Sequence, residues 1–89
     1  MSLCDKVKQL VSEGWKLIDV REPQEFAVAH IEGATNVRLH DIHTLGEGKY
    51  VLYCRSGARS GIAQEELTKV GTPAINAGGI NQFIGCLSR

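Results

Sequence analysis

The sequence predicts an α/β domain built on a small, mostly parallel sheet flanked by helices. Short apolar runs at 16–20, 49–53 and 74–76 have the length of buried strands. The segments at 3–11 and 59–70 instead carry apolar residues at helical spacing. Alternation of strands and helices is typical of parallel sheets, because each crossover between parallel strands is usually made by a helix.

The composition is that of a soluble globular chain, and we expect one domain spanning residues 1–89, since no repeat or linker interrupts it. Ten basic and ten acidic residues cancel, which leaves no net charge to attract nucleic acid or an anionic membrane. No apolar run approaches the roughly 20 residues that cross a bilayer. The first six residues lack the layout of a secretory signal. The odd number of widely spaced cysteines favours reducing surroundings, so we expect a cytoplasmic protein.

The first third of the chain is expected to form a helix, a strand and a second helix. The helix over 3–11 should end before Gly14, because glycine suits the position just past a helix end. A buried strand at 16–20 follows. Pro23 is favoured in a first helical turn and introduces a short helix over 24–29.

The middle of the chain should hold the main strand and the longest helix. A brief strand is expected at 36–39, and at most two helical turns at 41–45. A second buried strand is expected at 49–53, and an amphipathic helix follows over 59–70. The inner face of that helix is expected to be made of apolar side chains, namely Ile62, Ala63, Leu67 and Val70. On the exposed side of the long helix, Glu65 can pair with Lys69 one turn on.

The last third should close the fold with shorter elements. A short strand is expected at 74–76, a turn at 77–79 and a final helix over 80–87.

The residues after the strand at 49–53 predict a reactive thiol. Cys54 follows the apolar run and precedes a loop of small residues that turns into a helix. The loop N–H groups and the positive end of the helix dipole both favour an anion there. Arg55 and Arg59 add fixed positive charge. These influences lower the pKa of a thiol, and the thiolate is its reactive form.

The other cysteines and the histidines carry no comparable signal. Three widely spaced cysteines do not indicate a disulfide framework, so Cys4 and Cys86 are interpreted as packing or surface residues in reducing surroundings. His40, Asp41 and His43 lie in a segment that we interpret as a solvated turn. The sequence therefore implies no metal.

Four segments of the chain resemble the signatures of rhodanese-like domains. They are DVREPQEF at 19–26, HIEGATNV at 30–37, YCRSGARS at 53–60 and AGG at 77–79. The segments occur in the family's order, and the resemblance extends from residue 16 to about residue 83. It implies a rhodanese-like three-layer fold, with the small parallel sheet between two layers of helices.

The resemblance also implies a sulfurtransferase that needs no cofactor. In this family the loop cysteine, here Cys54, takes the outer sulfur of a small anionic donor such as thiosulfate and becomes a persulfide. A thiol, a protein acceptor or cyanide then collects the sulfur, in two half-reactions. The residues expected to bind the donor and hold the persulfide form the loop: Arg55, Ser56, Gly57, Ala58, Arg59 and Ser60.

Two other functions stay open at this point. Cysteine phosphatases with a related fold have five residues between cysteine and arginine, whereas Cys54 and Arg59 are separated by four, and Ser60 stands where the arginine would be needed. The shorter loop suits a sulfur atom better than a tetrahedral oxyanion. The second alternative is a non-catalytic persulfide carrier or regulatory binding module, because a fold does not fix a function.

Overall fold

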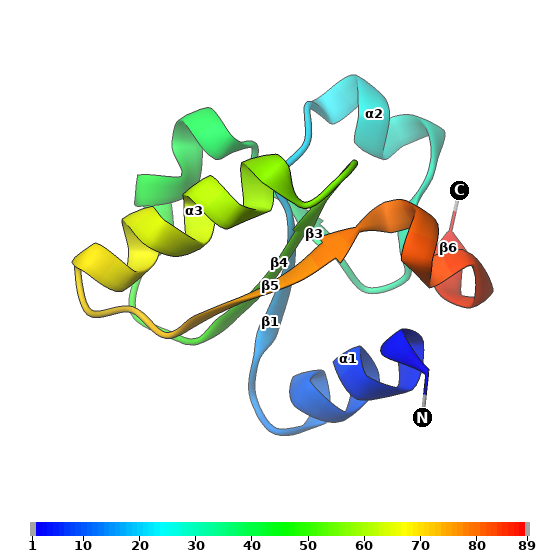
Figure 1. Cartoon of the computed structure of the whole chain (residues 1–89), viewed down its shortest axis with the longest axis horizontal. Helices are drawn as coiled ribbons and strands as arrows, with labels where there is room; N and C mark the ends of the chain where they lie inside the picture. The colour runs from blue at the N-terminus through cyan, green and yellow to red at the C-terminus, as the bar shows by residue number, and fades with distance from the viewer. Residues whose placement is uncertain (1, 89) are drawn as a thin grey trace.

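The structure is a computed structural model that describes residues 2–88, and its centre is a four-stranded parallel sheet (Figure 1). The strands are β1 (Lys16–Asp19), β2 (His30–Ile31), β3 (Thr35–Asn36), β4 (Tyr50–Cys54), β5 (Ala74–Gly79) and β6 (Leu87–Ser88). The α-helices are α1 (Leu3–Ser12), α2 (Pro23–Val28) and α3 (Ala58–Lys69), and the 3-10 helices are η1 (Leu39–Thr44) and η2 (Ile80–Cys86).

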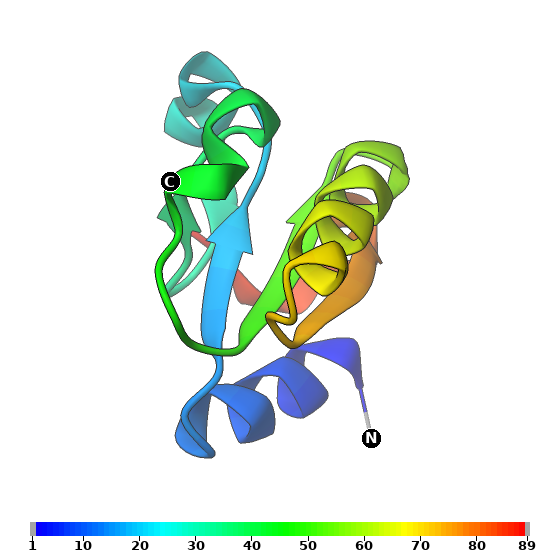
Figure 2. The same ribbon diagram turned by 90° about the vertical axis from the view of Figure 1, so that its left-hand side faces the viewer.

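The central sheet has the strand order β3-β1-β4-β5, and all of its neighbouring strands are parallel. Strands β1 and β4 run side by side in both views (Figures 1 and 2). The α/β class expected from the sequence is therefore confirmed. Because β4 lies between β1 and β5, its carboxyl end is close to loops from several other elements.

Helices cover both faces of this sheet, with α3 and η1 on one side and α1 and η2 on the other (Figure 1). Side chains of β4 alternate between the two cores, as a strand requires. Leu52 and Cys54 pack on the α3 side, whereas Val51 and Tyr53 pack on the α1 side. All four are fully buried, which explains the continuous apolar run in this strand.

Cys4 and Cys86 form a disulfide, so their interpretation as packing or surface residues was wrong. The bond joins α1 to the end of η2, on the face of the sheet away from α3. Next to it, β6 pairs antiparallel with β2, and Ile31 lies opposite Leu87. No local pattern predicts either contact, because both bring together residues from distant parts of the chain.

The helix expected over 59–70 is present as α3, but its buried face differs from the expected one. Ala63 and Leu67 are buried as expected, and the third buried residue is Ser60. Ile62 is 50% exposed and Val70 is 76% exposed. Ser60 lies on the buried face, where its hydroxyl contacts Cys54 and Asn76, and an apolar pattern does not predict such polar contacts. Lys69 also pairs with Glu66 rather than with Glu65.

Other boundaries shift for local reasons. The brief strand expected at 36–39 is β3, at Thr35–Asn36, and a 3-10 helix already begins at Leu39. The segment 77–79 is part of β5 rather than a turn, and it contains a bulge where Tyr53 pairs with Gly78. The final helix over 80–87 is a 3-10 segment interrupted at Phe83. Among residues 2–88, no helix has the length and apolar character needed to cross a membrane.

Candidate active site

Cys54 occupies the carboxyl end of the central strand, where ligands bind in open α/β sheets. The chain leaves β4 at this residue and enters α3 at Ala58. Gly57 caps the helix with φ +98°, a left-handed conformation that glycine adopts without strain. The loop therefore curls back over the strand end and covers the thiol, and Cys54 has no exposed surface.

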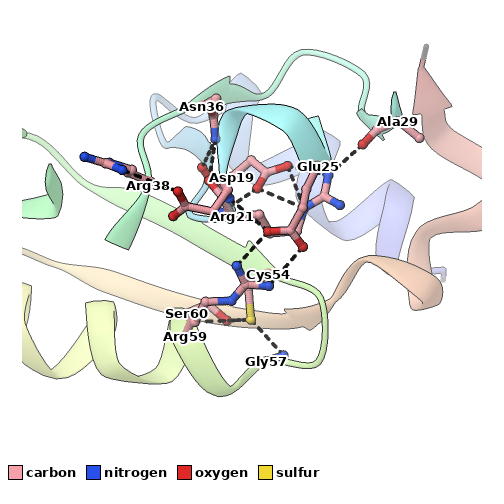
Figure 3. A network of polar contacts seen from close by, with 11 residues as sticks. Asp19, Arg21, Glu25, Ala29, Asn36, Arg38, Cys54, Gly57, Arg59 and Ser60 are labelled. Atoms are coloured by element: carbon pink, nitrogen blue, oxygen red, sulfur yellow. Dashed lines mark hydrogen bonds and ion pairs between the residues drawn. The ribbon is translucent and has the colours of Figure 1, made fainter. Parts of the chain in front are cut away.

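Hydrogen-bond donors converge on the Cys54 sulfur from the loop and the first turn of α3 (Figure 3). The N–H of Gly57 lies 3.0 Å from Sγ, the N–H of Ser60 lies 3.4 Å away, and the Ser60 Oγ lies 3.5 Å away. Burial alone would raise the pKa of the thiol. The donors of Ser60, Ser56 and Gly57 outweigh that effect, and the pKa of Cys54 is lowered. The site is arranged to hold a sulfur anion.

Arg59 does not point into the loop but binds Glu25 of α2 through two parallel hydrogen bonds (Figure 3). Its Nη1 lies 2.8 Å from Oε1, and its Nη2 lies 3.1 Å from Oε2. Both side chains are about two-thirds buried. Arg59 was expected to bind the donor, and this geometry instead supports a role in bracing the loop. Glu25 ties α2 to the helix that carries the site.

This ion pair should make stability depend on pH in the acid range. The hydrogen bonds from Arg59 hold the pKa of Glu25 at about 2, below the 4.5 of an unfolded chain. The stabilisation is therefore fully present above pH 4.5 and is lost as the pH falls towards 2. We expect Glu25→Gln to cost about 1–2 kcal/mol near neutral pH, and progressively less as the pH falls through this range.

Denaturant unfolding of both proteins at a series of pH values measures this difference. Glu66→Gln is the matched control, because Glu66 pairs with Lys69 at 3.6 Å on an exposed surface. We expect its cost to be small at every pH. A cost of Glu25→Gln that stays constant down to pH 2 would show that the ion pair does not stabilise the fold as described.

A second ion pair fixes the loop after β1. Asp19 is fully buried and accepts hydrogen bonds from the backbone N–H and the guanidinium of Arg21. The same guanidinium donates to the Ala29 carbonyl at 2.6 Å, and the Asn36 amide donates to the carbonyls of Asp19 and Arg21. Through these contacts, Asp19 and Arg21 organise the loops beside the site.

Arg55 is the loop arginine whose charge is not paired with a described carboxylate. It is exposed, and its side chain forms no hydrogen bond or ion pair with residues 2–88. It lies on the edge of an open hollow of about 400 Å³ beside the loop. The other residues lining that hollow come from α2 and its ends, η2 and β6: Arg21, Glu25, Val28, Ala29, Ile80, Asn81 and Leu87.

The glycine pair of β5 allows the loop to pack directly on the neighbouring strand. A Cβ at Gly79 would lie 2.6 Å from the Arg55 carbonyl oxygen, which is too close for any side chain. A Cβ at Gly57 would approach the Gly78 backbone at 3.3 Å. The pair therefore permits close backbone contact between the loop and β5.

The remaining predicted loop residues have backbone roles. The Ser56 hydroxyl accepts a weak hydrogen bond from the N–H of Ala58 at 3.4 Å, and Ala58 begins α3. Two polar residues that touch the site were missed: Glu25 and Asn76. Across residues 2–88, no three His, Cys, Asp or Glu side chains converge as metal ligands would.

The chain is similar to a known family and to curated relatives. The model of the Rhodanese-like domain family matches residues 3–86. The chain is 33% identical over 91 residues to "Thiosulfate sulfurtransferase PspE" of Escherichia coli, covering 93% of this chain and 86% of that protein. It is 42% identical over 67 residues to "Uncharacterized protein YqhL" of Bacillus subtilis, but spans only about half (52%) of that protein's length.

The fold is also found among solved structures. The structure described as "rhodanese with anions from E. coli" superposes with a TM-score of 0.74 at 28% identity. The match covers 83% of this chain and 96% of that one.

Proposed function

Because this chain belongs to the family of rhodanese-like domains, we propose that it is a thiosulfate sulfurtransferase in which Cys54 carries the transferred sulfur. The observation that carries the proposal is the convergence of the Gly57 and Ser60 donors on the buried Cys54 sulfur at the end of β4. A thiol held in this way is prepared to become an anion without any metal or organic cofactor.

The reaction has two half-reactions. The Cys54 thiolate attacks the outer sulfur of thiosulfate, the sulfur–sulfur bond of the donor breaks, and sulfite leaves with the bonding electron pair. The enzyme is then a persulfide whose outer sulfur carries the negative charge. An acceptor thiolate or cyanide attacks that sulfur, and the Cys54 thiolate is released. The loop N–H groups stabilise the anion in both forms.

The arrangement of Arg59 argues against the phosphatase alternative. A phosphate cradle needs a guanidinium directed at the oxyanion, and here both terminal nitrogens of Arg59 bind Glu25. Ser60, the next residue, offers one hydroxyl close to the sulfur. The loop thus supplies donors for one sulfur anion, and the Arg59 guanidinium binds Glu25 of α2 instead of an oxyanion.

Intact mass spectrometry of the whole chain after exposure to thiosulfate tests the function. The expected result is a gain of one sulfur atom, which disappears when cyanide or a thiol is added. The absence of any adduct would support a binding module instead. Cys54-dependent hydrolysis of an aryl phosphate would support a phosphatase.

Arg55 should assist the dianionic donor, thiosulfate, more than a thiol acceptor, which carries at most one negative charge when it reacts. Its charge is exposed at the loop and is not neutralised by a described carboxylate. We expect Arg55→Ala to lower kcat/KM for thiosulfate about 10-fold or more, the effect of losing one charge-assisted hydrogen bond. Transfer from the persulfide to a thiol acceptor should change much less.

Separate kinetics of the two half-reactions measure this difference. Arg55→Lys is the matched control, since it keeps the charge and should recover part of the lost rate. Equal losses in both half-reactions would remove Arg55 from the role of donor-binding residue.

The acceptor and the compartment are proposals as well. The open hollow beside Arg55 has room for a large acceptor, such as a thiol or persulfide carried on another protein. The cytoplasmic location stays a prediction from the sequence. The Cys4–Cys86 disulfide weighs against it, because disulfides persist mainly in oxidising compartments.

A further inference from the structure

Asn76 of β5 contacts the Cys54 loop, the first turn of α3 and its own strand at the same time. Its Oδ1 accepts a hydrogen bond from the Ser60 hydroxyl at 2.7 Å and another from the Gly78 N–H at 2.9 Å. Its Nδ2 donates to the Gly57 carbonyl at 3.1 Å. This side chain therefore touches both residues whose groups hold the Cys54 sulfur.

The partners of Asn76 fix the orientation of its amide group. The Gly78 N–H can only donate, so the atom facing it must be the oxygen. The Gly57 carbonyl can only accept, so the atom facing it must be the nitrogen. A flipped amide would place donor against donor and acceptor against acceptor.

This orientation decides where the hydroxyl hydrogen of Ser60 points. A serine hydroxyl has one hydrogen to donate, and two acceptors compete for it. The Asn76 oxygen is 2.7 Å away, whereas the Cys54 sulfur is 3.5 Å away. Since the amide oxygen cannot donate, the hydrogen must lie between Ser60 and Asn76. In the thiol form, Ser60 therefore presents lone pairs to the sulfur instead of its hydrogen.

We propose that Asn76 is a positioning residue that controls the Ser60 hydroxyl: it holds the hydrogen away from the Cys54 thiol and releases it when the sulfur becomes an anion. The role rests on the proposed function, in which that anion forms in both half-reactions. On ionisation, the thiol proton leaves to water, and the Ser60 hydroxyl rotates towards the sulfur without transferring its own proton.

The release costs little because the Asn76 oxygen keeps a second partner. After Ser60 turns away, Oδ1 still accepts from the Gly78 N–H, so no buried acceptor is left unpaired. The bond from Nδ2 to the Gly57 carbonyl is unaffected and keeps the loop in place. The bulge in β5 supplies this second donor, because it turns the Gly78 N–H towards the Asn76 side chain.

The test is the pH profile of Cys54 alkylation by iodoacetamide, without any sulfur donor, in four proteins. These are the parent chain, Asn76→Ala, Ser60→Ala and the double variant. Cys54 is the free cysteine while Cys4 and Cys86 are paired, so the profile reports its pKa alone. Thermal melting of each protein shows that it is folded.

We expect the effect of Asn76→Ala to depend on Ser60. With Ser60 present, the freed hydroxyl donates to the thiolate and shifts the pKa of Cys54 downward. The change in the Cys54 pKa that Asn76→Ala causes should be more negative with Ser60 present than in the Ser60→Ala background, by about half a pKa unit or more. Any loosening of the loop through Gly57 is common to both backgrounds and cancels in the comparison.

Equal shifts in the two backgrounds would overturn the proposal and leave Asn76 as a brace of the loop. If Asn76→Ala does not fold, Asn76→Asp serves in its place. The aspartate holds the Ser60 hydrogen more strongly, so the pKa of Cys54 should rise more with Ser60 than without it.

The charged groups around the sulfur are the same in the four proteins, and the carboxylate that Asn76→Asp would add is present in both Ser60 backgrounds. The shared charged groups are Arg55 on the loop, Arg59 with its partner Glu25, and the Asp19–Arg21 pair after β1. Because the assay uses no sulfur donor, its result is independent of the proposed transferase activity. A chain that forms no persulfide would refute the function and leave the hydroxyl result standing.

Discussion

Replacing Cys54 by serine should abolish sulfur transfer while leaving the fold intact. A serine hydroxyl is not ionised near neutral pH and cannot hold a transferable sulfur as a persulfide does. We expect no mass gain with thiosulfate and a loss of turnover of at least about 10,000-fold, typical of removing a covalent nucleophile. The side chain is nearly the same size, so the fully buried site should keep its packing.

The matched control replaces the two disulfide cysteines together. A chain with serine at Cys4 and Cys86 keeps the loop and should still gain one sulfur at Cys54 when it is folded. A sulfur adduct on the Cys54→Ser protein would place the transferred sulfur on another residue and would contradict the mechanism.

Loss of the Cys4–Cys86 disulfide should cause the largest change in stability. The bond closes a loop across 82 positions, which is nearly the whole chain. Restricting an unfolded chain over that length stabilises the fold by about 4–5 kcal/mol in the chain-entropy picture. The total stability of a domain of 89 residues is on the order of 4–13 kcal/mol. The disulfide therefore accounts for a large share of it.

Thermal and denaturant unfolding with and without reductant measure this effect. We expect reduction to lower Tm by roughly 15–40 °C, since 1 kcal/mol shifts Tm by about 4–8 °C in a domain of this size. The experiment is best made in the Cys54→Ser background, where no third thiol can exchange with the disulfide. Unchanged unfolding after verified reduction would refute the stabilising role.

The features that the sequence predicted correctly depend on local patterns. The apolar run before Cys54 must be a strand buried on both faces, and the glycine in the following loop permits the turn into α3. The helix that ends before Gly14 and the strand that ends at Asp19 were predicted from local patterns in the same way. A thiol at the end of a central strand could therefore be recognised before the structure was known.

The features that were missed depend on which segments become neighbours. Nothing near Cys4 points to Cys86, because their pairing follows from the packing of α1 against η2. In the sequence, Asn76 is a polar residue within an apolar strand. Its contacts with Ser60 and Gly57 form only because β5 lies beside β4. The burial of Ser60 in place of Ile62 likewise reflects contacts across the site that no helical pattern shows.

The disulfide has a consequence for how an oxidised or sulfur-loaded Cys54 can be discharged. Many redox-active cysteines are restored by a second, resolving cysteine in the same chain. Here the other two cysteines are bonded to each other in the core on the opposite face of the sheet. In the proposed reaction, a sulfur on Cys54 therefore could not be removed by a thiol of the same chain. An external acceptor would have to collect it, so the supply of acceptor would set the lifetime of the proposed persulfide.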